Sequence, residues 1–192
     1  MINGQTVLAV IPARGGSKRV PRKNVRDFRG KPLFQWASDA AQQSQYIDTL
    51  IISTDDAEIA FMAETLEIQI MVRPAELATD SASSEDVLRY CLEVHPSDWV
   101  VLLQPTSPLR TSEDIDACIE RAQMGYGCIS VDSRGETNGA VYVATAEWLA
   151  AHDFNHMGLM KYRMPDERSL DINTEADLFD QAYEDMLFSS VQ

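Results

Sequence analysis

The stretch TVLAVIPARGGSKRVPRKN, residues 6–24, joins an apolar run to a glycine-containing basic loop. Residues 6–12 are rich in Val, Leu and Ile, which predicts a buried strand. In open α/β sheets ligands bind beyond the carboxyl ends of the strands, so the loop lies where a site is expected. Gly15 and Gly16 can adopt positive φ and bring backbone N–H groups close to a phosphate, while the surrounding cations supply charge.

The basic loop matches neither of the two common glycine-rich phosphate motifs. It contains no GxxxxGK[ST] and no GxGxxG. The alternative to a phosphate-binding loop is a solvated basic turn, which its position directly after a strand makes the weaker reading. We therefore expect a triphosphate-binding loop of another kind.

The charge distribution points to a small anionic ligand. The chain has 192 residues and a formal net charge of -14, which argues against nucleic acid or an acidic membrane surface as a partner. Eight of the 16 basic residues nevertheless lie between Arg14 and Lys31, with Asp27 as the only acidic residue among them. Because the local field governs binding at a few ångströms, this cluster suits a small polyanion.

Apolar runs alternate with segments of helical period along the rest of the chain, which indicates an α/β domain with a mainly parallel sheet. We expect one domain over residues 1–192. Strands are predicted at residues 6–12, 49–53, 68–72, 99–103, 128–131, 140–144 and 159–164. Helices are predicted near residue 33, after residue 56, from Ser83 or Ser84, at residues 112–125 and at residues 174–187.

Two further features bear on where the protein works. No segment approaches the roughly 18 to 20 apolar residues of a membrane span, and no secretory leader is recognisable, so we expect a cytoplasmic protein. The three cysteines, Cys91, Cys118 and Cys128, form no CxxC pair and are expected to be buried free thiols.

Six blocks of the sequence, in this order, resemble the acylneuraminate cytidylyltransferases. They are IPARGGSKRVPRKN (11–24), ISTDD (52–56), RPAELATDSASS (73–84), LLQPTSPLR (102–110), NGAVY (138–142) and LDINTEADL (170–178). The resemblance implies a single-domain Rossmann-like sandwich of the nucleotidyltransferase, glycosyltransferase-A-like type. It also implies an enzyme that activates a 2-keto sugar acid with CTP and Mg²⁺, releasing pyrophosphate.

The same resemblance assigns roles to residues of the first three blocks. Arg14, Ser17, Lys18 and Lys23 look like the triphosphate-binding set, and Asn24 looks like a nucleotide contact. Since phosphoryl transfer depends on positioning and charge neutralisation, Arg14, Lys18 and Lys23 form, with Asp171, the predicted catalytic set.

The third block is expected to recognise the nucleoside. Arg73, Ala82 and Ser84 are similar to residues that hold the base and ribose in the family. For Ser84 the alternative is an N-cap of the following helix.

The fourth and fifth blocks are expected at the boundary with the acceptor. Gln104 and Thr106 resemble the segment between nucleotide and sugar, and Asn138 resembles a residue that contacts the sugar acid. Asn138-Gly139 could instead be a plain turn. Arg110 could pair with the acceptor carboxylate or act as a structural clamp.

The sixth block departs from the family, which reads Asp-Ile-Asp where this chain has Asp171-Ile172-Asn173. The two aspartates are associated with magnesium in the family, and Asn offers only a neutral carbonyl. Asp171 is therefore the metal candidate, with Asn173 as a weakened ligand. Asn173 or Thr174 could alternatively cap the last helix.

A second departure is the short connection between Val131 and Asn138. The sialic-acid enzymes carry a longer excursion there that contributes to dimerisation and to the acceptor pocket. Whether this chain forms the same dimer, and which acid it uses as acceptor, are therefore left open. Arg134 is the only candidate for the basic group that contacts the acceptor. Three functional hypotheses follow. They are a cytidylyltransferase for a sialic-acid-like nonulosonic acid, a nucleotidyltransferase using another acid or triphosphate, and a nucleotide-binding protein without turnover.

Overall fold

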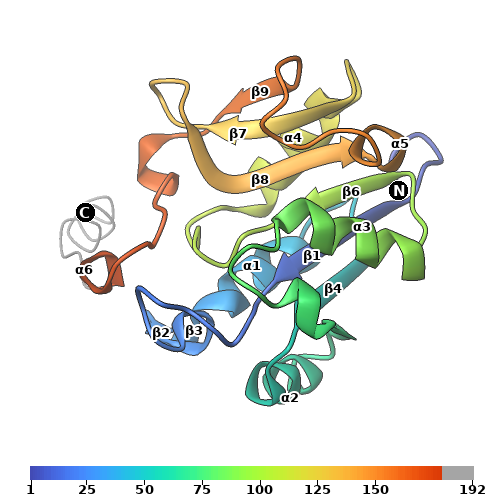
Figure 1. Cartoon of the computed structure of the whole chain (residues 1–192). Helices are drawn as coiled ribbons and strands as arrows, with labels where there is room; N and C mark the ends of the chain where they lie inside the picture. The colour runs from blue at the N-terminus through green and yellow to red at the C-terminus, as the bar shows by residue number, and fades with distance from the viewer. Residues whose placement is uncertain (179–192) are drawn as a thin grey trace.

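Strand β1 (Val7–Pro12) lies at the centre of a seven-stranded sheet with the order β5-β4-β1-β6-β8-β7-β9. The computed structural model describes residues 1–178 (Figure 1). Side chains of β1 alternate between the two faces of the sheet, as a strand requires. Val7, Ala9 and Ile11 join the core on one face, and Leu8 and Val10 join the core on the other.

The sheet is mainly parallel, as predicted. Strand β1 pairs in parallel with β4 and β6, β4 pairs in parallel with β5, and β7 pairs in parallel with β9. Strand β8 is antiparallel to both β6 and β7. The other six strands are β4 (Thr49–Thr54), β5 (Gln69–Val72), β6 (Trp99–Leu102), β7 (Gly127–Val131), β8 (Thr137–Thr145) and β9 (Met160–Arg163).

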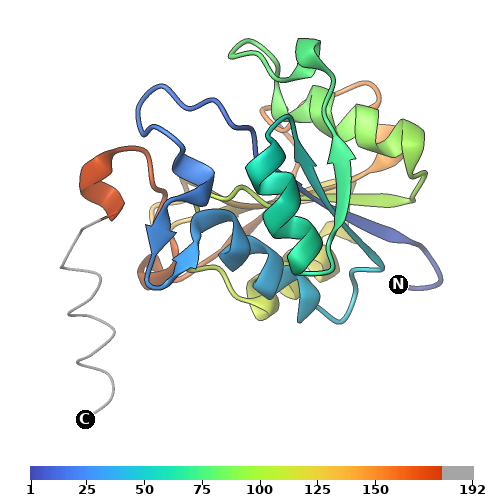
Figure 2. The same ribbon diagram turned by 90° about the horizontal axis from the view of Figure 1, so that it is seen from below.

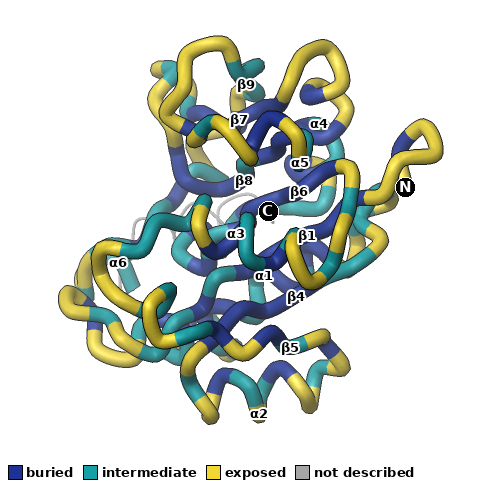
Figure 3. Tube along the Cα trace, turned by 45° about the vertical axis from the view of Figure 1, so that its right-hand side comes forward, coloured by how far each residue is buried: buried dark blue, intermediate teal, exposed yellow. Residues whose placement is uncertain are grey.

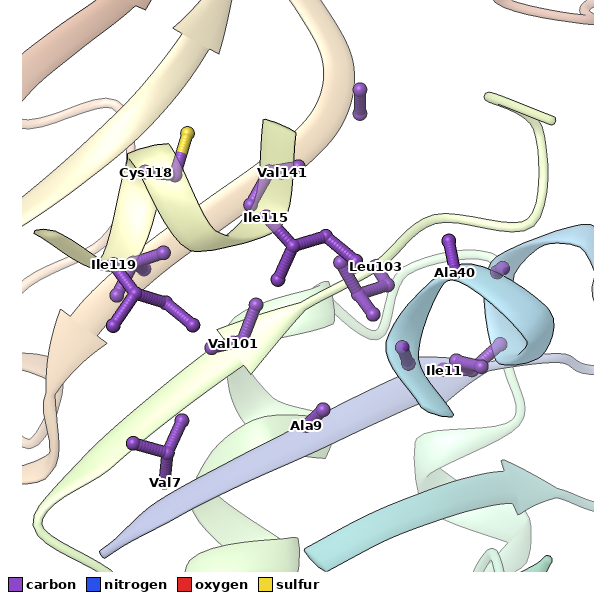
Figure 4. Close-up of a cluster of buried hydrophobic side chains, with 14 of the residues drawn as sticks. Val7, Ala9, Ile11, Ala40, Val101, Leu103, Ile115, Cys118, Ile119 and Val141 are labelled. Atoms are coloured by element: carbon purple, nitrogen blue, oxygen red, sulfur yellow. The ribbon is translucent and has the colours of Figure 1, made fainter. Parts of the chain in front are cut away.

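Helices cover both faces of the sheet. The first core cluster packs α1 (Leu33–Gln42), α2 (Ala57–Thr65) and α4 (Ser112–Ala122) on one face; Figure 4 shows Ile115 and Ile119 of α4 beside Val101 of β6. The second packs α3 (Ser84–Val94) and α5 (Ala146–Leu149) on the opposite face. In Figure 3 the central strands are buried and the connecting loops are exposed. No helix within residues 1–178 has the length and apolar composition needed to cross a membrane.

The short elements were not predicted. A two-stranded hairpin of β2 (Asp27–Phe28) and β3 (Lys31–Pro32) leads into α1, and single turns of 3₁₀ helix occur at Lys23–Val25, Ala75–Leu77 and Asp166–Arg168. The predicted last helix begins as α6 (Glu175–Leu178), and its remainder lies outside the described residues. The three cysteines are buried free thiols, as expected.

The carboxyl ends of β1, β4, β5 and β6 meet at one edge of the sheet, because these strands run in the same direction. The loops that follow them, with α6, lie at the end of the molecule away from the N-terminus (Figure 2). The chain returns to this edge after β9, where the Ile172 backbone N–H donates to the Thr106 carbonyl at 2.8 Å. This return brings the sixth block of the sequence beside the basic loop.

Candidate nucleotide pocket

A pocket of ≈ 540 Å³ opens at this edge of the sheet. Its walls come from the loops after β1, β5 and β6 and from the segment around Asp171. Every residue predicted to bind the nucleotide or the metal lines it, as do Gln104 and Thr106. The lining residues are Pro12, Arg14, Gly16, Ser17, Lys18, Arg19, Lys23, Asn24, Arg73, Thr79, Asp80, Ala82, Ser83, Ser84, Val87, Gln104, Pro105, Thr106, Asp171 and Asn173.

The glycines of the basic loop act differently from the prediction. Neither Gly15 nor Gly16 has a positive φ. The Gly15 N–H donates to Asp55 Oδ1 at 2.9 Å, and a Cβ on Gly15 would lie 2.4 Å from Asp56 Oδ2. Gly15 is therefore required for close approach of the next loop, and only Gly16 of the pair lines the pocket.

Two cations of the basic loop are held by one carboxylate. Arg14 Nη1 lies 2.8 Å from Asp80 Oδ1, and Lys18 Nζ lies 2.5 Å from Asp80 Oδ2. The pKa of Asp80 is lowered by the hydrogen bonds from Lys18 and Arg14. Asp80 belongs to the third sequence block, so it joins the predicted triphosphate loop to the predicted nucleoside loop.

Lys23 and Asn24 fix the far end of the basic loop. Lys23 Nζ donates to the Ile172 carbonyl at 2.9 Å, and burial lowers its pKa while the nearby Asp171 carboxylate raises it. Asn24 Nδ2 donates to the Arg14 carbonyl at 2.8 Å, which closes the loop on itself. Lys23 therefore places a positive charge next to Asp171.

The predicted nucleoside loop, residues 73–84, starts from a buried arginine. Arg73 is 6% exposed; its Nη2 donates to the Ser53 carbonyl at 2.7 Å and its Nε to the Ser53 hydroxyl at 3.3 Å. Burial lowers the pKa of Arg73. The N-cap of α3 is Ser83, whose Oγ accepts from the Asp86 N–H, so the capping alternative for Ser84 is wrong. Ser84 and Ala82 face the pocket instead.

Gln104 lies above a glycine of β8. Gly139 has a φ of 77°, and a Cβ there would lie 3.0 Å from Gln104 Oε1 and 3.8 Å from Asp171 Cγ. Arg110 is buried behind this loop and donates to the Gln104 carbonyl; burial lowers its pKa to about 9. The clamp reading of Arg110 fits this placement, since Arg110 does not line the pocket.

Among the residues that line the pocket, Asp171 is best suited to act as a metal ligand. Its Oδ1 is buried without a hydrogen-bond partner among residues 1–178, and its Oδ2 accepts from Asn173 Nδ2 at 2.7 Å. The Asn173 amide oxygen accepts from Arg19 at 3.3 Å. No group of three or more His, Cys, Asp or Glu side chains suited to a metal occurs in the described part of the chain. One free carboxylate oxygen fits Mg²⁺, which commonly uses one or two carboxylates together with substrate phosphates and water.

The capping alternative applies to Thr174 and not to Asn173. Thr174 Oγ1 accepts from the Asp177 N–H at 3.4 Å, and Asp177 Oδ2 accepts from the Asn173 and Thr174 N–H groups at 2.7 Å each. Thr174 thus caps α6, while the Asn173 side chain donates a hydrogen bond to the Asp171 carboxylate.

Two predicted acceptor contacts lie outside the pocket. Asn138 is 6% exposed; its Oδ1 accepts from the Ser130 hydroxyl at 2.6 Å, and its Nδ2 donates to Ser169 Oγ at 3.0 Å. Asn138 therefore ties β8 to β7 and to the segment before Asp171. Arg134 forms ion pairs with Asp132 and Glu136 at the tip of the β7–β8 connection.

Several residues of the pocket were not predicted from the sequence. Asp80 and Thr79 lie inside the third block and Arg19 inside the basic loop, so their positions in the sequence were a usable signal. An acidic residue is not expected among groups that bind a polyanion, so the chemistry of Asp80 gave no signal.

The chain has a nucleotidyltransferase-type fold, and its basic loop lines a pocket at the carboxyl edge of the sheet. The structure of a CMP:2-keto-3-deoxy-manno-octonic acid synthetase complexed with CTP has the same fold, with a TM-score of 0.77 over 96% of this chain and 99% of that chain at 15% sequence identity.

The chain belongs to the cytidylyltransferase family, whose model matches residues 8–164. It is 32% identical over 185 residues to the CMP-N,N'-diacetyllegionaminic acid synthase of Legionella pneumophila, covering 73% of this chain and 78% of that protein. It is 36% identical over 126 residues to the N-acylneuraminate cytidylyltransferase of Escherichia coli, covering 64% of this chain. The chain spans 30% of the length of that relative. The family resemblance of the six blocks is thereby confirmed.

Proposed function

We propose that the protein transfers a cytidylyl group from CTP to a 2-keto sugar acid of the nonulosonic type. The oxygen of the sugar hydroxyl forms a bond to the α-phosphorus of CTP and loses its proton to solvent. The bond between the α-phosphorus and the α,β-bridging oxygen breaks, and pyrophosphate leaves. The observation that carries the proposal is the convergence of Arg14, Lys18 and Lys23 with Asp171 on one pocket. Fixed charges around a leaving pyrophosphate are what this reaction requires.

The chain's own residues have separate tasks in this proposal. Arg14, Lys18 and Lys23 bind the phosphates, and Arg73, Ala82 and Ser84 surround the cytidine. Gln104 and Thr106 lie between nucleotide and acceptor. Mg²⁺, held by Asp171 beside Asn173 and by phosphate oxygens, would neutralise charge on the leaving group.

Two features favour the cytoplasm as the place of this reaction. CTP is drawn from the nucleotide pool of that compartment, and three buried free thiols suit a reducing environment.

The acceptor is the least constrained part of the proposal. The relatives are named for different acids, N-acylneuraminate and diacetyllegionaminic acid among them. Asn138 is engaged by Ser130 and Ser169, and Arg134 by Asp132 and Glu136, so neither side chain reaches toward the pocket. These contacts favour keeping a second acid acceptor as an alternative within the same reaction.

The test is a pyrophosphate-release assay with each of the four nucleoside triphosphates and a panel of 2-keto sugar acids, with Mg²⁺. We expect release with CTP and at least one nonulosonic acid. Lys23→Gln should lower the rate by roughly 100-fold, the usual cost of removing one fixed charge-stabilising group. Lys161→Gln, which makes the same change on β9 outside the pocket, should leave the rate unchanged. Release with another triphosphate but not with CTP would refute the cytidylyl assignment.

A further inference from the structure

Within residues 1–178, Asp80 is the only residue of the nucleoside loop that forms ion pairs with the basic loop. It lies between β5 and α3, and each of its two oxygens meets a different cation. Oδ1 lies 2.8 Å from Arg14 Nη1, and Oδ2 lies 2.5 Å from Lys18 Nζ. All three side chains line the pocket.

Arg14 and Lys18 have no other carboxylate partner in the described part of the chain. The remaining cations of the pocket contact neutral groups: Arg19 the amide of Asn173, Lys23 the carbonyl of Ile172 and Arg73 the backbone and hydroxyl of Ser53. The nucleotide pocket therefore contains two kinds of cation, and only Arg14 and Lys18 form direct ion pairs with a carboxylate.

A carboxylate and a phosphate present the same groups to such a pair. Both offer two anionic oxygens on one atom, and both accept charge-assisted hydrogen bonds from guanidinium and ammonium donors. Asp80 has no other structural role that would require an acidic side chain, since it is exposed and caps no helix.

We propose that Asp80 occupies the place of a substrate phosphate group in the nucleotide-free protein and that the incoming triphosphate displaces it from Arg14 and Lys18. The inference rests on the proposed nucleotide site and adds a positioning residue to it. Asp80 keeps both cations directed into the pocket while it is empty, and it competes for them with the nucleotide and with pyrophosphate.

The contacts are weak enough to be displaced. The side chains of Asp80, Lys18 and Arg14 are 46%, 82% and 32% exposed. Ion pairs in such exposed positions contribute little, so removing the competitor should tighten phosphate binding by about 3- to 10-fold and not by orders of magnitude.

The experiment titrates inorganic pyrophosphate into the full chain by calorimetry, with EDTA present and no divalent metal, for the wild type and for Asp80→Asn. We expect the dissociation constant of Asp80→Asn to be about 3- to 10-fold lower. The sign is decisive, because a residue that merely supports the loop would weaken binding when replaced. The matched control is Glu76→Gln, which removes the same charge from the same loop at an exposed side chain outside the pocket. It should bind as the wild type does.

Three results would overturn the inference. Asp80→Asn could bind pyrophosphate no more tightly than the wild type, or neither the wild type nor Asp80→Asn could bind it at all. Glu76→Gln could also show the same gain in affinity, in which case the effect would come from net charge alone. Binding requires no turnover, so this comparison stays separate from the proposed reaction. If no triphosphate and sugar acid react while Asp80→Asn still binds pyrophosphate more tightly, the reaction is wrong and the role of Asp80 stands.

Discussion

Asn173 connects two charged groups through its two amide atoms. Its nitrogen donates to Asp171 Oδ2 at 2.7 Å, and its oxygen accepts from Arg19 at 3.3 Å. Asn173→Asp would set a second carboxylate against the first. Without metal, we expect the loss of the hydrogen bond and the like-charge contact to lower the free energy of unfolding by about 1 kcal/mol. With Mg²⁺, the added carboxylate should give a larger rise in melting temperature than the wild type shows.

The measurement is the melting temperature in EDTA and in Mg²⁺ for the wild type, Asn173→Asp and Asn173→Ala. The alanine variant loses the hydrogen bond to Asp171 without adding charge, so it should lose stability in EDTA and gain no extra response to Mg²⁺. An equal Mg²⁺ response in all three proteins would show that position 173 does not take part in metal binding.

At the scale of residues, the sequence predicted which side chains meet but not how each is used. Arg14 and Lys23 could be predicted because their loop directly follows a strand of the sheet, and Arg73 because its sequence block resembles that of the family. The direction of Asn138 could not be predicted, because it depends on the register of β8 against β7. That register shifts between Ile129 and Val131, beside the serine that bonds Asn138.

At the scale of elements, two adjacent serines at the start of α3 differ in their hydrogen bonds. Ser83 Oγ accepts from the Asp86 N–H at 3.0 Å, while the Ser84 side chain has no hydrogen-bond partner among residues 1–178 and lines the pocket. Ser83→Ala should lower the free energy of unfolding by ~1 kcal/mol, the usual cost of losing an N-cap. Ser84→Ala should leave that free energy within about 0.5 kcal/mol of the wild type.

Urea unfolding and CTP titration of the two variants give the comparison. Ser84→Ala should weaken CTP binding by roughly 2- to 12-fold, as expected for one hydrogen bond to the ligand. Ser84→Ala serves as the control for the unfolding measurement, since the side chain removed is identical. If Ser84→Ala bound CTP as tightly as the wild type, Ser84 would have no part in nucleoside recognition.

The length of an element decided whether it could be predicted. The strands β1, β4 and β6 show continuous apolar runs, and α3 and α4 show clear helical periodicity. The two-residue strands β2 and β3 and the four-residue helix α5 are too short to display a period. They form because tertiary contacts hold them, as when the Ala146 N–H donates to the Asp98 carbonyl at 2.9 Å.

At the scale of the whole molecule, two opposing electrostatic effects set the dependence of stability on pH. The net charge of -14 at pH 7 produces self-repulsion that weakens as the pH falls toward the isoelectric point of about 4.5. Against this, hydrogen bonds from neighbouring groups lower the carboxyl pKa of several aspartates. They are Asp56, Asp80, Asp98, Asp132 and Asp166.

The sign of the second effect follows from linkage. A carboxyl whose pKa is lower in the folded state stabilises the fold above its unfolded pKa of about 4, and this contribution is lost as the pH falls through the folded value. We therefore expect the free energy of unfolding, measured by urea denaturation at low salt, to rise slightly from pH 8 to about pH 5 and to fall steeply below about pH 4.

Salt distinguishes the two effects, because it acts on them to different degrees. At 1 M NaCl the screening length is about 3 Å, which removes long-range repulsion between surface charges but only weakens direct hydrogen bonds. The rise between pH 8 and 5 should then disappear, while the fall below about pH 4 should persist. The free energy of unfolding could instead stay constant down to pH 3 at either salt concentration. The carboxyl pKa values would then be the same in the folded and unfolded states, and the local contacts of these aspartates would contribute nothing to stability.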